Sequence, residues 1–345
     1  MNNSGNLTSA LTRTAITSLW ALNNLTRRRE VVFLTGSPRS GTTWMLEGFE
    51  QALYCRRNWE PVNMHFVSRA LTESNPLLVH ARPDGATIAA DGDLRRLVSD
   101  ALAGRVPLDP KLGVPPGDEG HLAKAARVAR ARPVVVKFVQ MQRAVPWLAQ
   151  VSEIRGCVLL RNPLAVVASQ IRHPKSSGVG IDPNWTEEII TAAHPIVNPA
   201  DRQHPIVDRL LGRSLSVVER LAVTACLDLL AAIGDAESRQ RFTYVLYEHL
   251  VVTPDGFADV IRRLDLSTQP SAPAVAPDAP SFMAGSGANV RKGSDPRVNW
   301  AGRMSTQQVD EVLAVMAAFG IDFYGSGPEP DVGALGRWQF ANLVG

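Results

Sequence analysis

The chain of 345 residues has few cysteines, no long apolar run and little net charge. Cys55, Cys157 and Cys226 are far apart and form no Cys-x-x-Cys pair, which argues against a disulfide framework or a zinc site and favours a reducing cytoplasm. No run reaches the roughly 18 to 20 apolar residues of a membrane-spanning helix. With 36 Lys and Arg against 33 Asp and Glu, the net charge of +3 argues against a general nucleic-acid binder.

The N-terminal segment, residues 1–29, lacks the early basic region and the continuous apolar centre of a secretory signal. Its leucines recur at helix-like intervals and precede three arginines at 27–29. Two interpretations stay open: a helix packed on the protein's own surface, or a peripheral membrane contact that would imply a lipid-like substrate. We expect this extension to be followed by one domain at 30–330 and a C-terminal tail at 331–345.

Apolar, β-branched runs alternate with helical stretches along the rest of the chain. The runs that begin at Val31, Pro133, Gly156 and Arg241 are typical of strands covered on both faces, and helices are predicted at about 40–53, 94–103, 121–132, 213–233 and 305–320. This pattern predicts an α/β fold in which a central parallel sheet binds ligands at the carboxyl ends of its strands. The irregular segment 173–213 is typical of a lid or binding loop.

The sequence VVFLTGSPRSGTTWM, residues 31–45, reads as a buried strand that turns through a glycine-bracketed loop into a helix. Gly36 and Gly41 permit a tight turn, and backbone amides at the mouth of a helix attract an anion. Arg39 adds a positive fork inside the loop. The predicted anion-binding residues are therefore Arg39, Ser40, Gly41, Thr42 and Thr43. The alternative is a tight strand-to-helix connection without a ligand.

The loop lacks the lysine of a nucleotide triphosphatase or kinase. Its spacing matches the pattern G-x-x-x-x-G-K-[ST], but Thr42 stands where the lysine that pairs the β- and γ-phosphates should be. An ATP-dependent kinase would also need a magnesium carboxylate, and no carboxylate pair in the sequence demands a metal. The positive residue is instead Arg39, and the aromatic Trp44 follows the two threonines.

This arrangement resembles the 5′-phosphosulfate loop of sulfotransferases, which commonly reads Pro-Lys-Ser-Gly-Thr-Thr-Trp, with Arg39 in place of lysine as in the Arg-Ser-Gly version of carbohydrate sulfotransferases. The resemblance implies a P-loop NTPase-like three-layer α/β/α fold with insertions that form a substrate lid. It implies 3′-phosphoadenosine 5′-phosphosulfate (PAPS) as cosubstrate and no metal. Arg39 would stabilise the departing nucleotide, and Trp44 would offer a stacking face.

Three further segments resemble the same family. Arg161 follows the strand that begins at Gly156, and Ser169 comes eight residues later; the resemblance implies that both bind the 3′-phosphate of PAPS, as do Arg291, Lys292 and Gly293 in a later loop. Tyr247, in YEHL, would lie near the adenine. Each segment also has an ordinary structural explanation when it is taken singly. An arginine at a strand end is typical of a surface ion pair, and adjacent basic residues are typical of a solvated loop. A tyrosine at a strand end is typical of a core.

A base must accept the proton of the acceptor as it attacks. Phenol and steroid sulfotransferases carry a histidine two residues after a lysine at the end of a central strand; here Lys137 matches the lysine, but the later position is Val139. The heparan branch uses a glutamate beyond the first helix, which makes Glu60 the candidate base and Lys137 the group that steadies the sulfuryl. The alternatives are a Glu60 ion pair with Arg56 or Arg57, a buried ion pair of Lys137, and the bases His65, His173 and His194.

The sequence therefore predicts a sulfotransferase that moves a sulfuryl group from PAPS to a hydroxyl, less readily an amine, of a glycan, glycolipid or natural product. The alternatives are an ATP-dependent kinase and a nonenzymatic nucleotide-binding protein. The acceptor and the oligomeric state are not predicted.

Overall fold

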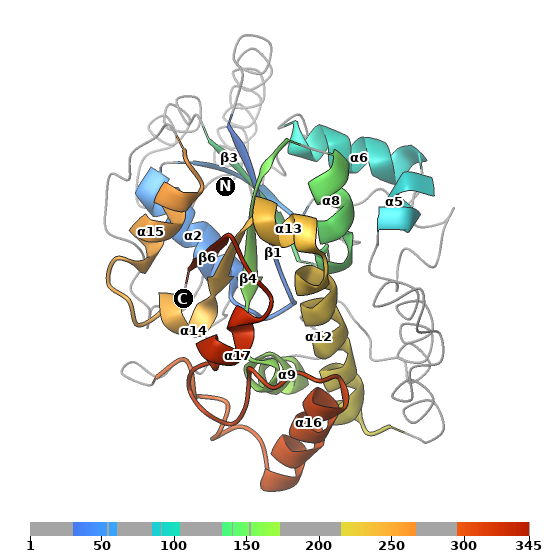
Figure 1. Ribbon diagram of the computed structural model, residues 1–345, viewed down its shortest axis with the longest axis vertical. Helices are drawn as coiled ribbons and strands as arrows, with labels where there is room; N and C mark the ends of the chain where they lie inside the picture. The colour runs from blue at the N-terminus through green and yellow to red at the C-terminus, as the bar shows by residue number, and fades with distance from the viewer. Residues whose placement is uncertain are drawn as a thin grey trace, which may run out of the picture.

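The structure of the protein is a computed structural model. It describes residues 30–53, 55–60, 85–90, 92–103, 133–139, 141–151, 153–172, 215–266 and 295–344. The N-terminal extension at 1–29, the helix expected at 121–132 and the segment 173–213 lie outside these ranges. Figure 1 shows a central sheet between helices.

A six-stranded parallel sheet forms the centre of the described chain. Its order is β2-β3-β1-β4-β5-β6, and every pairing between neighbours is parallel. The strands are β1 (Val31–Gly36), β2 (Arg56–Trp59), β3 (Val134–Phe138), β4 (Arg155–Leu160), β5 (Thr243–Leu246) and β6 (Asn342–Val344). Because all strands run the same way, their carboxyl ends meet at one edge of the sheet.

Side chains alternate between the two faces of the sheet. Phe33 of β1 joins one cluster of buried side chains, the first cluster, whereas its neighbours Val32 and Leu34 join the second cluster on the other face. Both faces are thus covered, which explains why the central strands read as continuous apolar runs.

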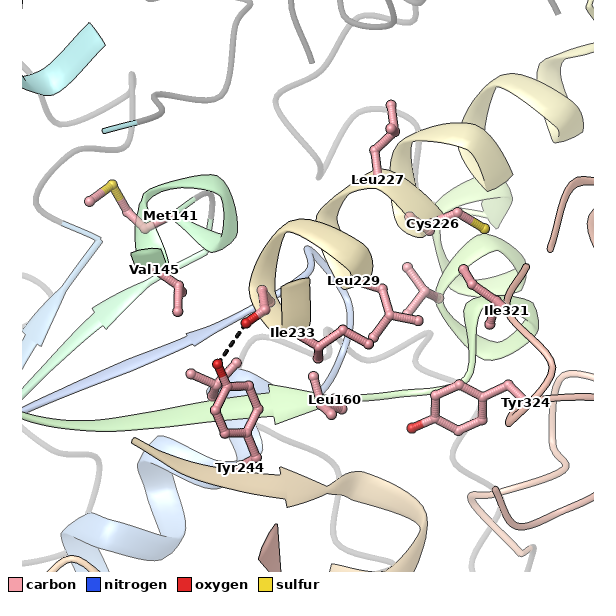
Figure 2. Packing of buried hydrophobic residues seen from close by; sticks show 14 of the residues in the cluster. Met141, Val145, Leu160, Cys226, Leu227, Leu229, Ile233, Tyr244, Ile321 and Tyr324 are labelled. Atoms are coloured by element: carbon pink, nitrogen blue, oxygen red, sulfur yellow. Dashed lines mark hydrogen bonds between the residues drawn. The ribbon is translucent and has the colours of Figure 1, made fainter. Parts of the chain in front are cut away.

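Helices supply the outer part of each cluster (Figure 1). The first cluster includes side chains from α5 (Gly85–Ala90), α6 (Gly92–Leu102), the 3₁₀ helix η1 (Gln142–Ala144), α8 (Val145–Val151), α9 (Pro163–Arg172), α12 (Val217–Gly234), α16 (Thr306–Ala318) and α17 (Val332–Gly336). The second includes α2 (Thr42–Leu53), α14 (Tyr247–Leu250) and α15 (Gly256–Arg263). The short α13 (Ala236–Arg241) precedes β5. Figure 2 shows part of the first cluster, where Leu160 packs near Leu229 and Ile233.

The helix boundaries follow local capping chemistry. Ser216 and Ser305 each begin a helix with a reciprocal capping box, formed with Glu219 and Gln308. The asparagine that precedes α9, Asn162, accepts a hydrogen bond through Oδ1 from the Leu164 amide at 2.9 Å, and proline occupies the first helical position. These stop and start signals give the chain its alternation of strands and helices.

The predicted α/β class and parallel sheet are confirmed, with strands at all four predicted runs. The helices predicted at 40–53, 94–103, 213–233 and 305–320 correspond to α2, α6, α12 and α16. The elements that were not predicted include the strands β2 and β6 and the helices α5, α8, α13, α15 and α17. Residues 342–344, expected to belong to a tail, pair with β5 as an additional strand. Within the described residues, no helix is long and apolar enough to cross a membrane.

Candidate functional site

The glycine-bracketed loop, residues 36–41, joins β1 to α2 at the carboxyl edge of the sheet. Gly41 has a φ of +104°, and a Cβ atom there would lie 2.6 Å from the ring of Tyr247. At Gly36, a Cβ atom would lie 2.6 Å from the Ser40 hydroxyl oxygen. Both predicted glycine positions therefore require glycine, one for its backbone angle and its neighbour, the other for space.

Two arginines meet at this loop. Arg39 donates from Nε to the Ser169 hydroxyl at 3.1 Å, and Arg161 donates from Nη1 to the Arg39 carbonyl at 3.1 Å. The structure thus brings together three residues that lie up to 130 positions apart. Burial lowers the pKa of Arg39, and the charge of Arg161 lowers it further. An anion beside the two guanidinium groups would stabilise the charge of Arg39.

Polar atoms with unused hydrogen-bonding capacity lie at the same place. The Ser40 hydroxyl and Arg161 Nε are buried and have no hydrogen-bond partner among the described residues. Buried polar groups usually have a hydrogen-bond partner, so these two atoms have the capacity to donate to an anion. The arrangement fits the predicted anion site.

An aromatic pair supports the second arginine. The guanidinium carbon of Arg161 lies 3.9 Å from the centroid of the Tyr247 ring, a cation–π contact. Trp44 packs edge-on against Tyr247 at 5.9 Å and is only 6% exposed. Trp44 therefore belongs to the second cluster and packs behind Tyr247. Tyr247 is itself 7% exposed and combines a place in the core with a contact to Arg161.

Glu60 and Lys137 form an ion pair at the carboxyl ends of β2 and β3. Trp59 pairs with Lys137 in the register of β2 against β3, and Glu60 is the residue after Trp59. Lys137 Nζ donates to Glu60 Oε1 at 2.5 Å and to the Thr43 hydroxyl at 3.0 Å. The Glu60 amide donates to the Lys137 carbonyl at 2.8 Å. The buried ion pair considered for Lys137 therefore exists, and its partner is the candidate base.

The alternative considered for Glu60 was an ion pair with Arg56 or Arg57. Arg57 makes an ion pair with Glu50 at 3.4 Å, while Glu60 pairs with Lys137. Burial lowers the pKa of Lys137, and the Glu60 charge opposes that shift. Through Thr43, the ammonium also contacts the first turns of α2 beside the glycine-bracketed loop. The acid–base pair and the arginine pair are thus parts of one continuous site.

Two of the four non-glycine residues with positive φ among the described residues belong to this site. Arg39 and Glu60 have φ values of 72° and 43°, in the left-handed region that non-glycine residues seldom adopt. Such conformations cost of order 1–3 kcal/mol each and cluster at functional sites. Arg39 and Glu60 are the two residues from which the sequence predicts the most chemistry.

The structure adds contacts that the sequence did not predict. Glu248 accepts a hydrogen bond from the Asn162 amide at 2.8 Å and another from the Tyr324 hydroxyl at 3.2 Å. Asn162 and Glu248 each directly follow a predicted site residue, which is the one sequence signal for them. Of the remaining predicted residues, Arg291, Lys292, Gly293 and the three histidines at 65, 173 and 194 lie outside the described residues.

No family model matches the chain, and no curated protein matches it. Among solved structures, the chain is similar to the "Sulfotransferase Domain from the Curacin Biosynthetic Pathway", with 14% sequence identity and a TM-score of 0.37. That similarity covers 86% of this chain and 99% of the other. A likeness at this level does not establish a shared function, so the function must be inferred from the site.

Proposed function

We propose that the protein is a PAPS-dependent sulfotransferase. The observation that carries this proposal is the convergence of Arg39, Ser169 and Arg161 at the carboxyl edge of the sheet. The loop residue Arg39 and the helix residue Ser169 would serve two separate anions, the 5′-phosphosulfate and the 3′-phosphate. A bisphosphorylated adenosine carrier supplies both anions in one molecule.

The described residues fit such a ligand. The Ser40 hydroxyl and Arg161 Nε can donate to an anion, and the Ser169 hydroxyl accepts from Arg39 and keeps its own proton to donate. Arg39 and the loop amides would bind the 5′-phosphosulfate; Thr42 and Thr43 begin the helix whose dipole favours it. Arg161 and Ser169 would bind the 3′-phosphate, joined by Arg291, Lys292 and Gly293.

Glu60 would act as the base. In the transfer, the acceptor oxygen forms a bond to sulfur, the bond from sulfur to the bridging phosphate oxygen breaks, and that oxygen leaves with the electron pair. The Glu60 carboxylate takes the acceptor proton. Arg39 would stabilise the charge that develops on the leaving oxygen, and Lys137 would steady the sulfuryl oxygens. The 2.5 Å contact between Lys137 and Glu60 keeps both groups beside the loop.

The position of the base bears on the acceptor. Val139 contributes no ionisable side chain two residues after Lys137, and the carboxylate of Glu60 reaches the same lysine from the neighbouring strand. We propose a hydroxyl of a glycan, glycolipid or natural product as the acceptor. We also propose that the fold is of the P-loop type and that the domain extends to β6, because this strand near residue 344 completes the sheet.

Ligand binding tests the cofactor assignment. Calorimetric titration should show tighter binding of adenosine 3′,5′-bisphosphate than of ATP with magnesium. Arg39→Ala should weaken bisphosphate binding by roughly 10- to 100-fold and Ser169→Ala by roughly 3- to 10-fold, since the first removes charged hydrogen bonds and the second a neutral one. A preference for ATP would favour a kinase and refute the proposal.

Arg155→Ala is the matched control. Arg155 begins β4 at the end opposite Arg161 and pairs with Glu30 and Asp265. Its loss should leave bisphosphate affinity within about twofold of wild type. Glu60→Gln should retain bisphosphate affinity but lose sulfuryl transfer from PAPS to a panel of glycan and glycolipid acceptors. Retained transfer would move the base to another residue, and bisphosphate binding without transfer in the wild type would favour a nonenzymatic binding protein.

A further inference from the structure

Two consecutive residues of α14 contact the two consecutive residues that join β4 to α9. The Tyr247 ring lies under the guanidinium of Arg161, and Glu248 accepts a hydrogen bond from the backbone amide of Asn162 at 2.8 Å. Arg161 is therefore held both through its side chain and through the amide of the next residue. Its Nη atoms donate to the carbonyls of Arg39 and Pro296, at 3.1 and 3.4 Å.

Glu248 is a buried carboxylate, only 1% exposed. Burial raises its pKa, whereas the Asn162 amide, the charge of Arg161 and the Tyr324 hydroxyl lower it. The pKa of Tyr324 is raised well above its ordinary value by burial and by the charge of Glu248, so its hydroxyl keeps its proton and donates to Glu248. A carboxylate retained in a core costs stability unless it is compensated, and the groups that compensate this one all belong to the surroundings of Arg161.

Asn162 extends the network to α9 and to the C-terminal segment. Its Oδ1 caps α9 by accepting from the Leu164 amide, and its Nδ2 donates to the Gly325 carbonyl at 2.8 Å. The helix α9 carries Ser169, the other group of the second anion site. Tyr324 and Gly325 thus hold the β4–α9 junction from one side, and α14 holds it from the other.

We propose that Glu248 and Tyr324 are positioning residues for Arg161, and that they thereby set the affinity of the site for the 3′-phosphate of the nucleotide. The inference rests on the proposed function, because it assigns the second anion to that phosphate. Neither residue needs to touch the ligand. Their effect is transmitted through the Asn162 amide and the orientation of the Arg161 guanidinium.

The test compares two nucleotides that differ by the phosphate in question. Affinities for adenosine 3′,5′-bisphosphate and adenosine 5′-monophosphate are measured by calorimetry for wild type, Glu248→Gln and Tyr324→Phe. Each variant should bind bisphosphate roughly 5- to 20-fold more weakly, because a charged hydrogen bond that positions Arg161 is lost, and should bind the monophosphate within about twofold of wild type. The ratio of bisphosphate affinity to monophosphate affinity should therefore be lower in each variant than in the wild type.

Tyr244→Phe provides a matched control. Tyr244 is fully buried in the first cluster, and its hydroxyl donates to the Ala232 carbonyl at 2.6 Å. Figure 2 shows this bond as a dashed line, with Leu160 between Tyr244 and Tyr324 in this view. The control also removes a buried tyrosine hydroxyl, but the hydrogen bond of this hydroxyl is not part of the network around Arg161. It should leave the affinity ratio unchanged even where it lowers the melting temperature.

The outcomes separate the two proposals. A wild type that does not prefer bisphosphate overturns the proposed function and this inference together. A wild type that prefers bisphosphate, with variants that keep the wild-type ratio, overturns the positioning role alone. Equal weakening of both nucleotides in the variants also overturns it, because a general structural defect would act on both ligands.

Discussion

The ion pair between Glu60 and Lys137 predicts a large coupling energy between two residues from neighbouring strands. The variants are Glu60→Gln, Lys137→Met and the double substitution. Each single change also disturbs other contacts, since Lys137 donates to Thr43 as well. A double-mutant cycle removes those separate costs and isolates the interaction between the two side chains.

The magnitude follows from distance and burial. The two side chains are 2% and 11% exposed, and their charged atoms lie 2.5 Å apart. At an effective dielectric constant of about 20, unit charges at that distance attract by about 6.6 kcal/mol. Glutamine at position 60 can still accept a hydrogen bond from Lys137, and water reaches the partly exposed Glu60, so the measured coupling is smaller than this energy. We expect a coupling of about 2–4 kcal/mol.

The assay is urea unfolding of the four proteins at neutral pH, followed by circular dichroism. An exposed pair provides the control: Arg262 Nη1 lies 2.5 Å from Asp259 Oδ1, the same distance, with 71% and 31% of the side chains exposed. Its coupling should be only about 0.2–0.5 kcal/mol. A Glu60–Lys137 coupling below about 1 kcal/mol, or equal to that of the exposed pair, would refute the reasoning that burial makes this contact strong.

Three further predictions concern the surroundings of the site. Gly41→Ala should weaken bisphosphate binding at least about 10-fold, because the added Cβ displaces Tyr247. Gly320 also has a positive φ but has open space around it, so Gly320→Ala should cost only about 1 kcal/mol of stability. Equal bisphosphate binding by the two variants would contradict this prediction. Glu248 has a higher pKa in the folded protein than in the unfolded chain, so the folded protein binds more protons between these two pKa values. The free energy of unfolding therefore falls as the pH rises through this interval. Glu248→Gln should remove this loss, so its stability relative to wild type should increase as the pH rises above the ordinary glutamate pKa in urea titrations. A difference that stays constant with pH refutes the prediction. All three cysteines are buried, and burial raises the pKa of Cys157 and Cys226, so an aromatic disulfide reagent should modify none before unfolding; one fast equivalent would contradict this.

The strands that the sequence predicts are those buried on both faces. β1, β3, β4 and β5 form the middle of the sheet, and their uninterrupted apolar residues reflect that burial. β2 and β6 form the two edges of the order and read as Arg-Arg-Asn-Trp and Asn-Leu-Val. Such short segments carry no strand pattern, so their place is decided by pairing with a neighbouring strand that exists only in the folded chain.

The residues of the candidate site also divide into those that a local sequence pattern predicts and those that depend on tertiary pairing. Arg39, Arg161 and Tyr247 are predicted because each stands in a local pattern where a strand ends. The pairing of Glu60 with Lys137 was not predicted, because it depends on the register of β2 against β3. A register is a tertiary property, and a shift of one residue would turn the side chains to the other face.

The residues that hold the site are harder to find from sequence than those proposed to contact a ligand. Glu248 meets Asn162 across 86 positions and Tyr324 across 76, and no local pattern marks any of the three as part of one network. Yet the parallel sheet makes their meeting a consequence of topology, since β4 and β5 are neighbours and both Asn162 and Glu248 lie just beyond their carboxyl ends. In a parallel sheet, polar residues that follow the ends of adjacent strands are therefore the natural places to search for positioning groups.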